Sequence, residues 1–152
     1  MEGRTRSQED TVPQAANTVV IARPVADVFA FFTTPANDPT WRSGVKEISG
    51  GTPAVGAVVK QTIAGPMGKG IPADIEITAL EQDAAYGFRG ITGPVRPVGR
   101  YTFTVVEDGT HVHFSLSAEI TGLKKLMMGA AVQKSMDAEV AGLAKAKALL
   151  EG

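Results

Sequence analysis

The stretch IARPVADVFAFFTTPANDPTW, residues 21–41, holds the end of a strand, a helix and a turn in close succession. Pro24 suits the first position of a helix, where its missing N–H removes no hydrogen bond. Apolar side chains then follow at helical spacing, namely Val25, Val28, Phe29 and Phe32. Residues 35–41 are rich in turn formers and predict a loop that holds one short helical turn. The stretch therefore predicts a strand followed by two short helices.

On the N-terminal side, residues 15–22 (AANTVVIA) end in β-branched residues and predict the first strand. Residues 1–14 are polar and charged without periodicity, which predicts a disordered leader before a single domain over 15–152. The sequence has neither the apolar stretch of a secretion signal nor a run of about 18 apolar residues. It therefore predicts a cytoplasmic protein without stable membrane insertion.

On the C-terminal side, residues 43–120 alternate between strand-like runs and turn formers, which predicts about six more strands. The alternation over 71–79 predicts one strand whose apolar face carries Ile71, Ala73, Ile75 and Ile77. A hairpin follows over 101–120, with Asp108-Gly109 expected as its two-residue turn. Its apolar face carries Tyr101, Phe103, Val105, Val112, Phe114, Leu116, Ala118 and Ile120.

The last segment, from about Gly122 to Leu150, predicts a helix roughly 43 Å long. Gly129 and Gly142 each weaken it by roughly 1 kcal/mol relative to alanine, and we expect a bend near Gly129. Glu139 and Lys147 interrupt its apolar side. That side otherwise carries Met128, Val132, Met136, Val140, Leu143 and Leu150.

Composition places the chain among ordinary globular proteins. Of its 152 residues, 43% are hydrophobic and 20% are charged. The 15 basic and 16 acidic residues give a net charge of -1, which argues against nucleic-acid binding. The absence of cysteine excludes disulfides, thiolate metal sites and cysteine nucleophiles. The sequence predicts no metal and no cofactor.

This order of elements resembles the helix-grip fold of the START-like superfamily, also called SRPBCC or Bet v 1-like. Residues 21–41 resemble the opening of that family, and three further segments resemble its next strand, final hairpin and helix end: VGAVV (55–59), DGTHVHFSL (108–116) and AGLAKAKALLEG (141–152). The resemblance covers about residues 15–151, and the closest subgroup is polyketide cyclase/dehydrase and lipid transport. It implies an α+β fold with a curved antiparallel sheet of about seven strands around a long C-terminal helix. It also implies a cavity between them, and no catalytic residue.

The predicted cavity wall consists of inward-facing residues. Gln61 is included because its strand must bury either the set holding Gln61 or the set holding Lys60, and a buried unpaired lysine costs far more than an amide. Plain core packing is the alternative for each wall residue. The wall candidates are Trp41, Gln61, Tyr86, Phe88, Tyr101, Phe103, Phe114 and Met127.

The histidines and two carboxylates could serve chemistry but are expected to face solvent. His111 and His113 alternate with apolar residues on one strand, which predicts an outward pair and not a metal site. Asp74 and Glu76 are predicted on the wet face of their strand and not as an acid/base pair.

Arg89 is also predicted to point outward, because Tyr86 and Phe88 occupy the inner face of its strand. An inward Arg89 or His113 would support an enzyme, and the absence of any titratable side chain at the cavity wall would exclude one.

Three functions stay open. The sequence favours a monomer or homodimer that binds a hydrophobic small molecule, such as a lipid, a fatty acid or a polyketide-like aromatic, in an internal cavity. The subgroup name suggests a polyketide cyclase or dehydratase as the alternative, with Tyr86, Arg89, Tyr101, His111 and His113 as weak support. Superfamily members that activate an Hsp90-type chaperone suggest a chaperone-interacting module. Binding is favoured over catalysis because no convincing acid, base or nucleophile lies on the predicted inner face.

Overall fold

The protein is described from a computed structural model, which covers residues 12–120 and 124–152, without the side chains of Pro66 and residues 124–127. Most of the predicted leader over 1–14 lies outside the described residues, and Gln14 is the first residue of β1. The elements in chain order are β1 (Gln14–Ile21), α2 (Val25–Thr33), η1 (Pro35–Asn37), α3 (Asp38–Trp41), β2 (Val45–Ser49), β3 (Val58–Ala64), η2 (Pro66–Gly68), β4 (Gly70–Pro72), β5 (Ile75–Glu81), β6 (Ala85–Gly90), β7 (Val95–Val106), β8 (Gly109–Ile120), α4 (Lys124–Ala141) and α5 (Leu143–Glu151).

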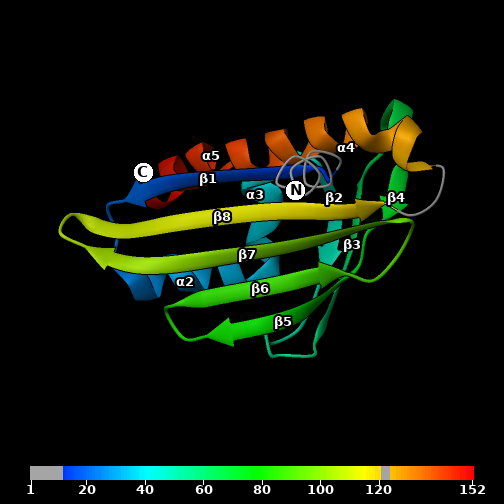
Figure 1. The fold of residues 1–152 in the computed structure, drawn as a ribbon. Helices are drawn as coiled ribbons and strands as arrows, with labels where there is room; N and C mark the ends of the chain where they lie inside the picture. The colour runs from blue at the N-terminus through cyan, green and yellow to red at the C-terminus, as the bar shows by residue number, and fades with distance from the viewer. Residues whose placement is uncertain (1–11, 121–123) are drawn as a thin grey trace, which may run out of the picture.

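The strands form one curved antiparallel sheet in the order β1-β8-β7-β6-β5-β3-β2, with the short β4 paired to β3. Figure 1 shows α2, α3, α4 and α5 on the same side of this sheet. The concave face is therefore covered by the two short helices and by the C-terminal helices. This is the arrangement that the helix-grip resemblance implied, so the predicted fold is confirmed.

The first helix follows from the apolar stripe read in the sequence. α2 begins at Val25 directly after Pro24, and it buries Val28, Phe29 and Phe32 against the sheet. Pro35 cannot continue the helix with a backbone hydrogen bond, and the chain passes instead into η1 and α3. The predicted short helices are thus present, and α3 brings Trp41 into the core.

The β7–β8 hairpin has the predicted faces except at Val105, which was predicted on the apolar face and is 69% exposed next to the turn, and the turn lies one residue earlier than predicted. Val106 pairs with Gly109, so Glu107 and Asp108 form the turn. Gly109 is instead the first residue of β8, with φ of 145°, and a Cβ there would lie 2.1 Å from the carbonyl oxygen of Ile21. The end of β1 passes so close that only glycine fits this position.

The prediction of one strand over 71–79 is wrong. β4 ends at Pro72 and pairs with β3, whereas β5 begins at Ile75. Asp74 stands between them, where its carboxylate accepts a bond from the Gln61 N–H (3.2 Å) and its own N–H donates to Thr92 Oγ1 (2.9 Å). These bonds replace ladder pairing, so Ile75 and Ile77 are buried while Ile71 is exposed.

The C-terminal helix is divided at Gly142, and the bend predicted near Gly129 falls within α4. α4 passes through Gly129, and α5 starts directly after Gly142. A Cβ on Gly142 would lie 3.1 Å from both Cε3 and the carbonyl oxygen of Trp41. The absence of a side chain at Gly142, one of the two glycines expected to weaken this helix, leaves room for Trp41 where α4 ends.

The C-terminal helices also hold the edge strand β1. Gln133 on α4 accepts a bond from the Gln14 N–H and donates to the Gln14 carbonyl, at 3.0 and 2.6 Å. Lys147 on α5 donates to the carbonyl oxygen of Val20 at 2.7 Å. These side chains satisfy backbone groups that an edge strand would otherwise offer to another chain.

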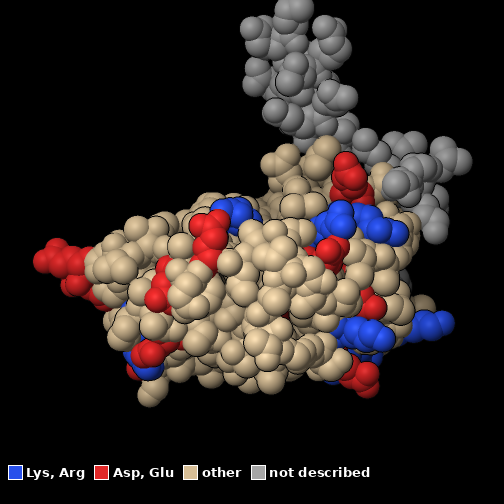
Figure 2. Space-filling view, turned by 90° about the horizontal axis from the view of Figure 1, so that it is seen from below, with Lys and Arg blue, Asp and Glu red and all other residues tan. Residues whose placement is uncertain are grey.

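The surface carries charges of both signs. Figure 2 shows the side of the molecule seen from below Figure 1, where lysine, arginine, aspartate and glutamate surround an uncharged middle. In the part of the chain that the structure describes, no helix has both the length and the apolar character needed to cross a bilayer.

Candidate functional site

The aromatic side chains predicted as cavity wall form one packed group, which we call the aromatic cluster: Trp41, Tyr86, Phe88, Tyr101, Phe103 and Phe114. The ring of Tyr101 is stacked on Phe114 at a centroid distance of 4.1 Å and on Tyr86 at 5.6 Å. Trp41 meets Phe114 edge to face at 6.4 Å. Phe88 is half-buried, and the others are buried. The cluster thus packs in the core on the concave face, and its role as a cavity wall that contacts a ligand stays a prediction.

The two remaining wall candidates are Gln61 and Met127. Gln61 is buried on β3, in the set that excludes Lys60, as the cost of burying a lysine required. Met127 lies in α4, but its side chain is outside the described part of the chain.

Beside the aromatic cluster lies a polar group that we call the Arg42 cluster, made of Arg42, Asp38, Gln61 and Glu139. Arg42 follows α3, and its Nη1 donates to Asp38 Oδ2 at 2.9 Å and to Gln61 Oε1 at 3.1 Å. Its Nε donates to Glu139 Oε2 on α4. Helix α3, strand β3 and helix α4 thus bring their side chains to a single guanidinium.

The Arg42 cluster is largely buried yet reachable. The side chains of Arg42, Asp38 and Glu139 are 13%, 17% and 21% exposed. Burial acts to lower the pKa of Arg42, but Glu139 and Asp38 outweigh it and raise that pKa above its usual value, so Arg42 stays charged. One guanidinium and two carboxylates share this enclosed space.

Asp38 is the group whose charge is least favoured there. Burial raises its pKa from 3.8 to about 6, against the opposing attraction of Arg42. Burial also raises the pKa of Tyr86 to about 12 and that of Tyr101 well above its usual value, and in both cases the Asp38 carboxylate adds to the shift. Both tyrosines therefore keep their protons at neutral pH and can act as hydrogen-bond donors.

The raised pKa of Asp38 predicts a pH-dependent stability. Between pH 3.8 and about 6 the folded state retains a proton that the unfolded chain has lost. The stabilisation from this proton is complete below pH 3.8 and is lost as the pH rises through about 6. We expect Asp38→Asn to gain about 2 kcal/mol relative to the wild type between about pH 4 and pH 7, measured by urea unfolding. The exposed Asp27→Asn serves as control, and a pH-independent difference for Asp38→Asn would contradict this account.

Trp41 carries a buried hydrogen-bond donor. Its side chain is buried, and Nε1 has no hydrogen-bond partner in the described part of the chain. A buried donor without a partner costs about 1–3 kcal/mol, so such a group calls for an explanation. Trp41 directly precedes Arg42 in the chain, and its ring packs edge to face against Phe32 and Phe114.

Sequence reasoning missed Asp38, Arg42 and Glu139. Two signals pointed to them: the i, i+4 spacing of Asp38 and Arg42, which matches a helical ion pair, and the interruption of an apolar helix face by Glu139. Neither signal indicates that Arg42 and Glu139, 97 residues apart, meet each other.

Arg89, Glu76 and the two histidines lie on the outer face, as the alternation predicted, whereas Asp74 lies between β4 and β5 and not on a strand. Arg89 is exposed and pairs with Glu76 at 2.7 Å. His111 and His113 are half-buried and alternate with the buried Val112 and Phe114.

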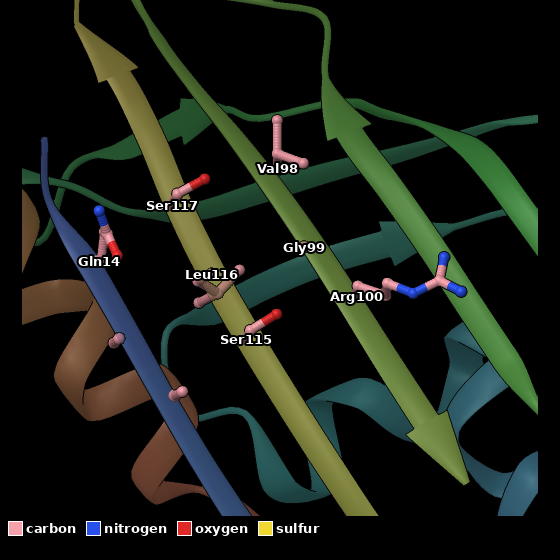
Figure 3. Close-up of a pocket in the computed structure, with 9 residues that line it drawn as sticks. Gln14, Val98, Gly99, Arg100, Ser115, Leu116 and Ser117 are labelled. Carbon is pink, nitrogen blue, oxygen red and sulfur yellow. The ribbon is translucent and has the colours of Figure 1, made fainter. Parts of the chain in front are cut away.

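A hollow of about 530 Å³ lies on the outer face, where β1, β8 and β7 run side by side. Figure 3 shows Val98, Arg100, Ser115 and Ser117 pointing to this side of the sheet, away from the helices. The hollow is therefore separate from the concave face, where the sequence predicted the cavity.

Comparison with known proteins supports the fold described above. The family model described as polyketide cyclase / dehydrase and lipid transport matches residues 13–148. No curated protein matches the sequence.

Solved structures show the same fold at low identity. The di-domain ARO/CYC StfQ from the steffimycin biosynthetic pathway is 16% identical with a TM-score of 0.76, over 97% of this chain and 54% of its own. The chain thus spans about half the length of that protein. A START superfamily protein from Mycobacterium smegmatis is 13% identical with a TM-score of 0.72, over 91% of this chain and 97% of its own. TTHA0849 from Thermus thermophilus is 18% identical with a TM-score of 0.69, over 90% of this chain and 97% of its own.

An antiparallel sheet curved around C-terminal helices, and a family match over nearly the whole described chain, lead to one assignment. The protein belongs to the polyketide cyclase/dehydrase and lipid transport family and has the START-like fold.

Proposed function

We propose that this protein binds a hydrophobic small molecule between the concave face of its sheet and its C-terminal helices. The aromatic cluster would supply the apolar wall and the Arg42 cluster the polar end of the site. The observation that carries the proposal is the convergence of Arg42, Asp38, Gln61 and Glu139 beside that wall.

The energetics of burial support a functional origin for the Arg42 cluster. An apolar replacement of a buried ion pair is often neutral or stabilising by about 1–4 kcal/mol, so folding alone does not require these charges. The partial exposure of Arg42, Asp38 and Glu139 leaves their free atoms within reach of a guest.

Apolar contact alone would give a weak site. A ligand that hides about 300 Å² of apolar area gains roughly 7 kcal/mol. Association costs roughly 4–15 kcal/mol, so a few polar groups must supply affinity and selectivity. The Arg42 cluster is the set of polar groups best placed on the concave face to do so.

Native mass spectrometry of the purified protein and thermal-shift titration with aliphatic and aromatic alcohols and acids test this proposal. We expect a co-purified molecule or a stabilisation that grows with ligand concentration, about 2.7 kcal/mol at a hundredfold excess over Kd. Trp41 is the single tryptophan, so its fluorescence should change on binding. The variant Val98→Glu, in the outer hollow, should bind equally well. No bound molecule and no stabilisation by any compound would contradict the proposal.

A cyclase or dehydratase activity is the second candidate, and Asp38 is the observation that favours it. A carboxyl with a pKa of about 6 beside protonated Tyr86 and Tyr101 has the properties that general acid/base catalysis needs. Turnover of a bound ligand, lost in Asp38→Asn while binding persists, would distinguish an enzyme from a carrier.

A further inference from the structure

We propose that the ligand presents an uncharged hydroxyl to the Arg42 cluster, so that the site selects alcohols and phenols over carboxylates with the same apolar body. This inference rests on the proposed binding function and specifies the chemical class of the ligand.

The charges of the Arg42 cluster are the first argument. Arg42 is already paired with both Asp38 and Glu139, so the ionised cluster carries one surplus negative charge. A ligand carboxylate would add a second negative charge in a space where these side chains are mostly shielded from water. Like charges repel more strongly there than in bulk solvent, whereas a hydroxyl brings no charge.

The hydrogen-bonding capacity of the cluster is the second argument. Arg42 donates from Nε and Nη1 to Glu139, Asp38 and Gln61, each carboxylate uses one oxygen in these bonds, and Nη2 donates to no described residue. The second oxygens, Asp38 Oδ1 and Glu139 Oε1, accept no hydrogen bond from a described residue, so each can accept one from a guest. A hydroxyl donates one hydrogen bond and accepts others, whereas a carboxylate can only accept.

The hydrogen-bond donors of the aromatic cluster are the third argument. The buried Nε1 of Trp41 offers a donor that no described residue accepts. The neutral hydroxyls of Tyr86 and Tyr101 offer further donors next to the same charges. A ligand hydroxyl beside the Arg42 cluster could thus accept from a tyrosine hydroxyl while donating to a carboxylate.

Calorimetric titration at about pH 7.5 with two matched pairs tests the inference: decan-1-ol against decanoate, and 2-naphthol against 2-naphthoate. We expect the alcohol or phenol to bind at least about tenfold more tightly than its carboxylate. Glu139→Gln removes one negative charge with little change of shape, and it should reduce this preference at least about threefold. Glu76→Gln, on the outer face beside Arg89, should leave the preference unchanged.

The outcomes separate the two proposals. Equal or tighter binding of the carboxylates, or an unaltered preference in Glu139→Gln, would overturn the selectivity and leave the binding function standing. Failure of every compound to bind would overturn the binding function itself. If Glu139→Gln does not fold by circular dichroism, Asp38→Asn removes the other carboxylate charge and should reduce the preference in the same way.

Discussion

Arg42→Met is expected to destabilise the protein by about 3–5 kcal/mol. The substitution removes the only guanidinium that Asp38 and Glu139 contact in the described part of the chain, and it leaves both carboxylates shielded from water. An uncompensated buried charge costs far more than the net contribution of the pair that it came from. Urea unfolding at about pH 7.5 measures the effect.

Arg89→Met provides the matched control. Arg89 also pairs with a glutamate, but its side chain is 59% exposed, so its removal should cost less than about 1 kcal/mol. Adding Asp38→Asn and Glu139→Gln to Arg42→Met should recover most of the lost stability, because no unpaired charge then remains. Equal effects of the two arginine substitutions would show that the Arg42 cluster is not effectively buried.

Phe114→Ala should cost about 3–5 kcal/mol, as expected for an aromatic residue removed from a packed core. Phe114 is fully buried on β8, stacks on Tyr101 at 4.1 Å and meets the edge of Trp41. Its removal leaves a cavity that these rings cannot close without leaving their own contacts. Thermal and urea unfolding measure the loss.

Val105→Ala, in the neighbouring strand β7, is the control for Phe114→Ala. Val105 is 69% exposed, so its truncation should change stability by no more than about 0.5 kcal/mol. If Phe114→Ala cost as little, the aromatic cluster would not be a central part of the core. A ligand that stabilises Phe114→Ala more than the wild type would show that the new cavity opens toward the binding site.

The fold was accessible from the sequence because local periodicity reports which face of an element is buried. The apolar stripe from Val25 to Phe32 predicted α2, and the alternation around Tyr101 and Phe114 predicted the β7–β8 hairpin. The choice of Gln61 over Lys60 for the inner face also followed from the cost of burial alone.

The errors share one cause, which is that contacts between distant segments override local signals. The end of β1 passes close to Gly109, where the turn lies one residue earlier than predicted. The predicted strand over 71–79 is divided into β4 and β5, and Asp74 between them forms hydrogen bonds with Gln61 and Thr92.

The sequence by itself determined the order of the elements, their buried faces and the family, since each depends on residues close together in the chain. Only the tertiary structure decided that Asp38, Arg42, Gln61 and Glu139 form one cluster. The curvature of the sheet and the crossing of α4 over it bring these side chains together. No spacing in the sequence encodes that meeting, because the free energy of placing charges beside one another depends on distance in space.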